Sequence, residues 1–365
     1  MSSKLGKEGK NQQHLRIVLT GGGTAGHVMP HLAILPELRR VGFSVYYIGS
    51  GGVEKGLAHG AGIPFFQIST GKLRRYLSVQ NGLDVFRIVV GFFQSVLLML
   101  RLKPDVVFSK GGFVAVPVTL AAWICRVPVV THESDYSPGL ANKIIAPFSR
   151  KILFTFPETA KYLPQFKSVH VGTPVRGELF NGDAARGKSV CGFSDAKPIL
   201  LVMGGSQGAQ RINEALKVIL DKVTKTYNVV HLTGKGKSIG YAAPGYRAFE
   251  FLGEELKDVL SAASVVVSRA GANSIFELLA LRKPMLLIPL EVGSRGDQVL
   301  NARSFQANGW AITLGETQMT PQSLEDSILR LGDNADIIQK EQAHAAVQAV
   351  PQRIADILQS IASSN

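Results

Sequence analysis

The residues of this chain that could do chemistry gather in short glycine-rich segments. The first segment, residues 19–32, reads LTGGGTAGHVMPHL and places Gly21, Gly23 and Gly26 in the spacing G-x-G-x-x-G. Glycines let the backbone turn tightly, and the N-terminus of a following helix offers N–H groups and partial positive charge to a phosphate. His27 stands in the same turn, where its imidazole could transfer a proton or could cap and pack.

A nicotinamide dinucleotide site needs an acidic side chain about 20 residues further on, at the end of the second strand. Here that strand ends YYIGSGG, and the next acid is Glu54. The missing acid disfavours an NAD oxidoreductase, so the loop is predicted to hold a different phosphate.

Two further glycine-rich segments follow apolar runs, SKGGFVAVP at 109–117 and MGGSQGAQ at 203–210. Each alone could be a plain strand-to-helix turn, but three such loops in one chain indicate anion binding. A fourth segment, SRAGANSIFE, carries Ser274 and Glu277 at the spacing of a capping box, so the spacing alone leaves the role of Glu277 open.

Short apolar runs alternate with helical runs along the whole chain, which predicts parallel sheets built from β-α repeats. The pattern stops at the polar stretch 176–198 and begins again at 199. We therefore predict an α/β protein with two Rossmann-like domains. The expected division is a flexible tail over 1–14, an N-terminal domain over 15–175, a linker or hinge over 176–198, a C-terminal domain over 199–345, and a C-terminal helix over 346–365 that packs back on the N-terminal domain.

The composition favours an anionic partner, because 40 Lys and Arg against 27 Asp and Glu give a net charge of +13. Cys125 and Cys191 are the two cysteines, which indicates neither a disulfide scaffold nor a metal site. The N-terminal tail lacks the apolar stretch of a signal peptide, and a cytoplasmic protein is expected. The uncharged run at 88–100 is shorter than the ~18 residues that span a bilayer, so it is either a core helix or a helix at a membrane surface.

Seven segments, in order, resemble the MurG family of peptidoglycan glycosyltransferases, and HESD and SRGDQ are similar to its Gram-positive members. The segments are GGGTAGHVMP, SKGGFVAVP, THESDYSPGLANK, GTPVR, LVMGGSQGAQRIN, SRAGANSIFE and SRGDQVLNA. The resemblance covers residues 15 to about 310 and implies the GT-B fold, two Rossmann-like domains with parallel sheets facing across a cleft.

The activity that the resemblance implies is an inverting transfer of N-acetylglucosamine from UDP-N-acetylglucosamine to lipid I. The acceptor is the 4-hydroxyl of the MurNAc in undecaprenyl-pyrophosphoryl-MurNAc-pentapeptide, and the product is lipid II for peptidoglycan synthesis. The N-terminal domain would hold the acceptor and the C-terminal domain the donor, with no metal and no cofactor. Two alternatives stay open: another GT-B sugar-nucleotide enzyme, such as a glycolipid glycosyltransferase or a UDP-sugar epimerase, and a non-catalytic binding protein.

The resemblance makes His27 the candidate base, with Glu133 and Asp135 as competitors. Asp135 stands where many relatives have Asn, and an ionised Asp only accepts hydrogen bonds. Asp297 departs in the same way from a frequent Gln, and Phe113 replaces a frequent Tyr.

The resemblance also assigns substrate contacts. Arg176 and Ser206 would lie at the donor diphosphate, the backbone of Leu252 at the uracil, Glu277 at the ribose and Gln298 at the sugar hydroxyls. The full set for the donor is Thr24, Ala25, Gly26, Asp135, Arg176, Ser206, Gln207, Gly208, Leu252, Ala272, Asn273, Ser274, Glu277, Asp297 and Gln298. The loops for the acceptor pyrophosphate are Gly22, Gly23, Gly111 and Gly112.

An apolar run beside basic residues in the acceptor domain predicts a peripheral anchor at the cytoplasmic face of the cell membrane. Its expected residues are Lys72, Arg74, Arg75, Phe92, Phe93 and Leu97. This patch argues against an epimerase, which has no lipid acceptor. Expected partners are UDP-N-acetylglucosamine, lipid I, the anionic membrane surface and other cell-wall synthesis or division proteins; no nucleic acid is expected.

Overall fold

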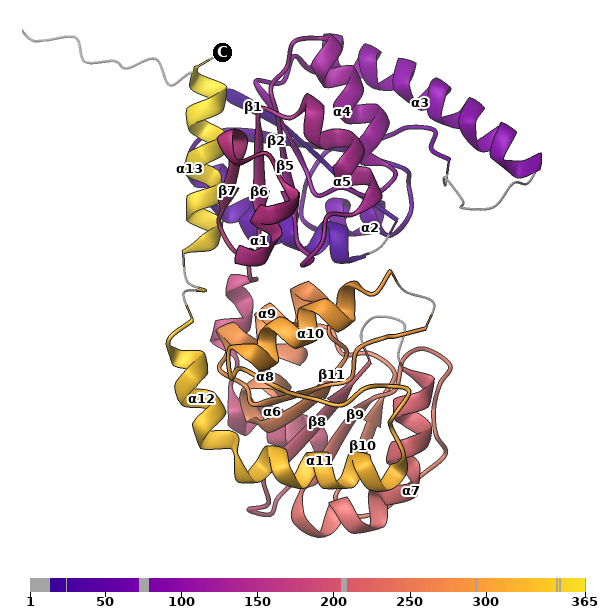
Figure 1. Cartoon of the computed structure of the whole chain (residues 1–365), viewed down its shortest axis with the longest axis vertical. Helices are drawn as coiled ribbons and strands as arrows, with labels where there is room; N and C mark the ends of the chain where they lie inside the picture. The colour runs from indigo at the N-terminus through magenta and orange to yellow at the C-terminus, as the bar shows by residue number, and fades with distance from the viewer. Residues whose placement is uncertain are drawn as a thin grey trace, which may run out of the picture. The chain divides into compact units, whose positions relative to one another are not determined.

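Two parallel sheets organise the chain in the computed structural model (Figure 1), which describes residues 14–23, 25–71, 79–204, 209–292, 295–345, 347 and 349–364. The seven-stranded sheet has the order β3-β2-β1-β4-β5-β6-β7, and the six-stranded sheet has the order β10-β9-β8-β11-β12-β13. The strands of the first sheet are β1 (Leu15–Thr20), β2 (Phe43–Gly49), β3 (Phe65–Gln67), β4 (Val106–Ser109), β5 (Val129–Glu133), β6 (Lys151–Phe154) and β7 (Ser168–His170). Those of the second are β8 (Ile199–Met203), β9 (Asn228–Leu232), β10 (Tyr246–Phe249), β11 (Ala263–Ser268), β12 (Met285–Leu287) and β13 (Ile312–Thr313).

Helices connect the strands as the β-α pattern predicts. The α-helices are α1 (Ala25–Arg40), α2 (Val53–Gly60), α3 (Val79–Leu102), α4 (Ala115–Ile124), α5 (Leu140–Ile145), α6 (Ala184–Cys191), α7 (Gln210–Thr226), α8 (Leu256–Ala262), α9 (Ala272–Ala280), α10 (Asp297–Ala307), α11 (Pro321–Asp333), α12 (Ala335–Ala343) and α13 (Val350–Ser363). Short 3-10 helices cover Ala146–Phe148, Pro157–Tyr162, Gln165–Lys167 and Gly177–Asn181.

The central strands are buried on both faces, which explains their continuous apolar runs. In β1, Ile17, Val18 and Leu19 are fully buried, and in β8 the same holds for Leu200 and Leu201. Strand order reverses beside β1 in the first sheet and beside β8 in the second. In open α/β sheets ligands bind outside the carboxyl ends of the strands at such switch points. This rule predicts one ligand site per sheet, beside β1 in the first sheet and beside β8 in the second.

Contacts along the chain divide it into two compact units. Unit 1 comprises Met1–Thr131, Ile144–Lys151 and Gln352–Asn365, and unit 2 comprises His132–Lys143 and Ile152–Pro351. Within unit 2, the predicted linker region contains the helix α6, which packs closely on α8. A Cβ on Gly187 of α6 would lie 2.2 Å from the Asp258 carbonyl oxygen, so glycine permits this close approach.

The C-terminal helix α13 belongs to unit 1, where it lies against the end of α1 (Figure 1). The Gln359 amide donates to the Val41 carbonyl oxygen at 3.1 Å. Ile354 and Leu358, on the inner face of α13, are fully buried. The last helix thus contributes core residues to the unit that begins the chain.

Helix α3 is packed at its C-terminal end, where Met99 and Leu102 join a buried cluster with Val18 and Val118. Its N-terminal part extends beyond the neighbouring helix α4 (Figure 1). Among the described residues, no helix, α3 included, is both long and apolar enough to cross a membrane.

Candidate active site

Two glycine loops interlock at the carboxyl ends of β1 and β4, where Thr20 pairs with Ser109. Gly112 has φ +79°, and a Cβ there would lie 2.7 Å from the Gly22 carbonyl oxygen. Gly23 has φ +89°, and a Cβ there would lie 2.6 Å from the Phe113 ring. Positive φ and lack of space together require glycine at both positions. The Phe113 ring packs on Gly23, which gives this position a packing role that needs no hydroxyl.

His27 lies in the first turn of α1, directly after the first glycine loop, and is half-buried. A Cβ on Gly112 would lie 3.6 Å from the His27 ring, so the imidazole borders the second loop as well. The structure therefore brings the candidate base together with the glycine loops proposed for the acceptor.

Two buried polar side chains, those of Tyr47 and His31, lie beside the first glycine loop. The Tyr47 hydroxyl donates to the Gly21 carbonyl oxygen at 2.6 Å. His31, one helical turn after His27, is fully buried between the edges of the Tyr47 and Phe108 rings. Burial, and secondarily the charge of Lys110, holds the pKa of His31 well below its usual value. His31 is therefore a neutral core group.

Glu133 organises the loop that follows β5. One of its carboxylate oxygens accepts from the Asp135 backbone N–H at 3.0 Å. The other accepts from the Gly139 backbone N–H at 2.9 Å and from the Asn142 amide at 2.8 Å. With both oxygens engaged by the loop itself, the contacts favour a structural role for Glu133 over that of a base.

Asp135 and Asp297 are the two acidic residues that depart from the family pattern. Within unit 2, both form an ion pair with the guanidinium of Arg295. Arg295 lies 3.4 Å from the Asp135 carboxylate and 2.7 Å from that of Asp297. The Asn301 amide also donates to Asp135 at 3.1 Å, and the Ser137 hydroxyl donates to Asp297 at 2.9 Å. The two unexpected carboxylates thus form one feature that links the β5 loop to the start of α10. Arg295 and Asn301 were missed by the sequence reasoning, although both lie inside the motif SRGDQVLNA.

Burial and the charge of nearby Glu133, with a smaller effect of Asp297, raise the pKa of Asp135 to about 6. Folding therefore favours the protonated form, so the free energy of unfolding falls as pH rises from about 4 to about 6. We expect Asp135→Asn to remove this fall and to be more stable than wild type at pH 7.5. Urea titrations at pH 4 and pH 7.5 measure the difference.

Because the family pattern that the chain resembles has Asn at this position, the same variant should keep kcat within about threefold of wild type. A loss of more than about 100-fold, the scale of a missing general base, would transfer the candidate base from His27 to Asp135.

The donor-side carboxylate, Glu277, pairs with Arg176. The Arg176 guanidinium donates to both Glu277 oxygens, at 2.9 and 3.3 Å, and both side chains are 18% exposed. Exposed Glu178 lies 3.2 Å from the same guanidinium. Helix α9 begins at Ala272 without a side-chain cap, so the capping-box alternative for Glu277 is wrong.

Other predicted donor residues lie around the carboxyl ends of the second sheet. Leu252 is buried while its neighbour Phe251 is 76% exposed. The Gln298 side-chain oxygen accepts from the Leu290 backbone N–H at 3.0 Å, so the amide nitrogen is the group with which this side chain can donate. Ala272, Asn273 and Ser274 form the first turn of α9. Thr24, Ser206, Gln207 and Gly208 lie outside the described residues, as do Lys72, Arg74 and Arg75 of the predicted membrane patch; Gly26 follows Ala25 in α1.

Solved glycosyltransferases share this two-sheet fold. The crystal structure of Acinetobacter baumannii MurG is 25% identical, covers 95% of this chain and 99% of its own, and superposes with a TM-score of 0.74. The glycosyltransferase of kitacinnamycin, at 17% identity, superposes with a TM-score of 0.73 over 95% of this chain and 98% of its own. Two doubly wound sheets of this kind are the GT-B fold of these glycosyltransferases, which confirms the predicted fold class.

Residues 17–154 match the glycosyltransferase family 28 N-terminal domain, and residues 199–358 match its C-terminal domain. The chain belongs to glycosyltransferase family 28.

Two curated relatives carry the name UDP-N-acetylglucosamine–N-acetylmuramyl-(pentapeptide) pyrophosphoryl-undecaprenol N-acetylglucosamine transferase. The protein of Lachnospira eligens is 52% identical over 87% of this chain and 90% of its own length. That of Geobacillus kaustophilus is 49% identical over 95% and 99%. The predicted enzyme class, a glycosyltransferase, is confirmed.

Proposed function

We propose that the chain transfers N-acetylglucosamine from UDP-N-acetylglucosamine to the MurNAc of lipid I and so forms lipid II. The observation that carries this proposal is the 49–52% identity, over most of both chains, with transferases named for that reaction. Both substrates carry a diphosphate. The switch points of the two sheets, beside β1 and beside β8, would each suit one diphosphate.

On the donor side, Glu277 would accept hydrogen bonds from the ribose hydroxyls with the lone pairs that its contacts with Arg176 leave available. Arg176 then has two roles, since its guanidinium orients Glu277 and adds positive charge for the departing UDP. The Gln298 amide nitrogen would donate to a sugar hydroxyl, since its side-chain oxygen already accepts from Leu290.

On the acceptor side, the interlocked loops at Gly22, Gly23, Gly111 and Gly112 would take the pyrophosphate of lipid I. In a single displacement, the acceptor oxygen bonds to the anomeric carbon as the bond to UDP breaks, which inverts that carbon. His27 would take the proton of the attacking hydroxyl, because its imidazole borders both loops. Glu133 is engaged by its own loop, and Asp135 by Asn301 and Arg295.

Release of UDP in EDTA, with and without a short-chain lipid I analogue, tests this function. Acceptor-dependent release is the expected result. Binding of UDP-N-acetylglucosamine without release would reject lipid I as the acceptor, and release without acceptor would indicate a hydrolase.

We further propose that α3 rests on the cytoplasmic face of the cell membrane. Exposed apolar side chains follow one another at helical spacing along one side of this helix, with exposures of 46–67%. They are Phe86, Val89, Phe93, Leu97 and Leu100. Of the predicted patch, Phe93 and Leu97 belong to this stripe, whereas Phe92 packs against the buried cluster of unit 1. The exposed apolar side of α3 is therefore the side of Phe93, and the packed side is that of Phe92.

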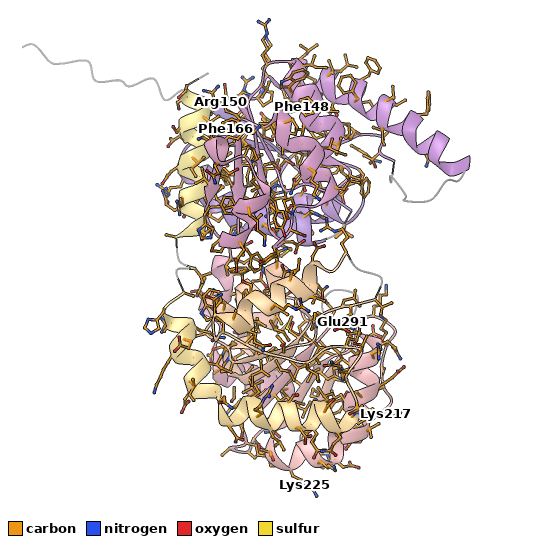
Figure 2. The ribbon with its side chains drawn as sticks, viewed as in Figure 1. Phe148, Arg150, Phe166, Lys217, Lys225 and Glu291 are labelled. Atoms are coloured by element: carbon orange, nitrogen blue, oxygen red, sulfur yellow. The ribbon has the colours of Figure 1, made fainter. Side chains whose placement is uncertain are left out.

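A second exposed apolar group in unit 1 is a further candidate for membrane contact. Trp123 and Ile124, at the end of α4, are 53% and 56% exposed, and the Trp123 ring packs against Phe148. Figure 2 shows Phe148 at the same end of the unit as the exposed Arg150. Aromatic and basic side chains together suit an anionic interface. This group was missed by the sequence reasoning, although Trp123 followed closely by Arg126 could have indicated it.

The double variant Phe93→Glu with Leu97→Glu should lose at least about tenfold in binding to vesicles that contain anionic lipid. Burial of each large apolar side chain contributes about 1.5–3 kcal/mol. Sedimentation with the vesicles measures the bound fraction, and 1 M salt should weaken wild-type binding as well.

The matched control is Val218→Glu on α7, an equally exposed apolar residue of unit 2, at 70%. It should bind vesicles like wild type. Equal loss in the control, or no loss in the α3 variant, would contradict the proposed surface.

A further inference from the structure

Three buried polar side chains, one each from α7, β9 and β10, form a chain of hydrogen bonds that we call the relay. His231, at the end of β9, is fully buried, and the exposures of Asn213 on α7 and Tyr246 on β10 are 1% and 7%. One ring nitrogen of His231 lies 3.0 Å from the Tyr246 hydroxyl, and the other lies 3.0 Å from the Asn213 side-chain oxygen.

The contacts of Asn213 determine the direction of every hydrogen bond in this relay. Its amide nitrogen donates to two carbonyl oxygens, those of Thr233 at 3.0 Å and Lys237 at 3.4 Å. Its oxygen therefore faces His231 and accepts from Nε2–H. His231 Nδ1 then has no hydrogen and accepts from the Tyr246 hydroxyl.

The relay is uncharged near neutral pH. Burial lowers the pKa of His231 to about 4, and burial, with a smaller effect of Tyr241, raises the pKa of Tyr246 to about 12. A single neutral tautomer of His231 thus holds Asn213, and Asn213 holds both ends of the turn from Thr233 to Lys237.

The relay joins two segments on the donor side of the fold. Helix α7 begins directly after the glycine-rich segment that follows β8, and the Thr233–Lys237 turn directly follows β9. These strands are neighbours, with Met203 beside Leu232 at their carboxyl ends. A move of the turn relative to α7 would therefore occur at the edge where the donor is proposed to bind.

An apolar trio could fill the same space without the cost of burying polar groups. A fully satisfied polar relay instead fixes distance and direction between the elements that it joins. The structure thus contains a rigid link where its proposed ligand needs a defined geometry.

We propose that Asn213 and His231 are positioning residues that hold the Thr233–Lys237 turn against α7 and thereby set the affinity for the nucleoside diphosphate. This inference rests on the proposed UDP-sugar transferase function.

Two conservative variants of one residue separate positioning from general stability. In His231→Gln, the side-chain amide reaches the place of Nε2 and keeps the bond to Asn213. In His231→Asn, the shorter amide reaches only the place of Nδ1 and keeps the contact with Tyr246. We expect the KM for UDP-N-acetylglucosamine and the calorimetric Kd for UDP to rise about tenfold in His231→Asn and to stay within about threefold in His231→Gln.

In both variants, kcat and the KM for the acceptor should stay within about twofold of wild type. Tyr246→Phe is the matched control, because it removes the outer donor and leaves the bond between His231 and Asn213. Its KM for the donor should stay within about threefold. If His231→Asn has the same KM for donor and acceptor and the same Kd for UDP as wild type, the proposal is overturned, whatever the melting temperature of the variant. The relay would then only stabilise the fold.

If His231→Asn does not fold, hydrogen exchange of the wild-type protein provides the second test. UDP should protect the backbone amides of residues 233–238 together with those of the first turns of α7. Protection of α7 alone would overturn the proposed link. If the wild-type protein neither binds UDP nor catalyses the transfer, the proposed function is rejected. Failure of the proposed function can thus be distinguished from failure of the positioning proposal.

Discussion

His27→Ala should lower kcat by about 10²- to 10⁴-fold while the KM for UDP-N-acetylglucosamine changes by less than about threefold. A general base acts on the proton that leaves in the transition state, so its removal affects the chemical step more than donor binding. His27 lies half-buried beside both interlocked glycine loops, where the acceptor pyrophosphate is proposed to bind. Steady-state rates of UDP release with varied donor and fixed acceptor measure both constants.

The matched control is His59→Ala, which removes an exposed histidine of α2 in the same unit. It should keep wild-type kcat and KM. Calorimetric binding of UDP to His27→Ala, unchanged from wild type, would show that the donor site is intact. Turnover within about threefold of wild type in His27→Ala would exclude this histidine as the base.

Glu277→Gln should raise the KM for UDP-N-acetylglucosamine and the Kd for UDP by about 10- to 100-fold. Hydrogen bonds to a charged acceptor contribute about 1.5–3 kcal/mol, and the amide has no charge to offer the ribose hydroxyls. The same change removes the ionic partner of Arg176. Calorimetry with UDP measures the loss without the need for turnover.

Two comparisons separate the roles of this carboxylate. Glu178→Gln removes the other, 64% exposed partner of Arg176 and should leave the Kd for UDP within about twofold. Wild type should prefer UDP to 2′-deoxy-UDP, and Glu277→Gln should lose most of this preference. An undiminished preference would mean that Glu277 orients Arg176 and does not contact the ribose.

The strands and glycine loops could be predicted because their signals are local. The apolar run LRIVLT at 15–20 is the strand β1, and the apolar runs at 104–109 and 127–133 contain the shorter strands β4 and β5. Gly42, a residue type that often ends helices, lies just past α1 and has φ +92°. Apolar runs and glycines carry such information within a few residues, so a single sequence is enough.

The contacts of the site could not be predicted because they join distant residues. Arg295 pairs with Asp135 from 160 positions away, and Arg176 reaches Glu277 across 101 positions. The structural role of Glu133 depends on the path of its loop, which brings Gly139 and Asn142 to one carboxylate. The near-continuous apolar run of α3 likewise concealed which of Phe92 and Phe93 points outward. Each of these facts requires a folded backbone.

The pair of carboxylates that shares Arg295 has a consequence for selective inhibitors. Asp135 and Asp297 leave one net negative charge around a single guanidinium at neutral pH. Relatives with neutral amides at these two positions lack both acidic groups. A competitive compound that places an amine or amidine against this point would gain ionic attraction in this chain that such relatives do not offer. Selectivity between bacterial groups would then depend on these two positions rather than on the proposed contacts with the nucleotide.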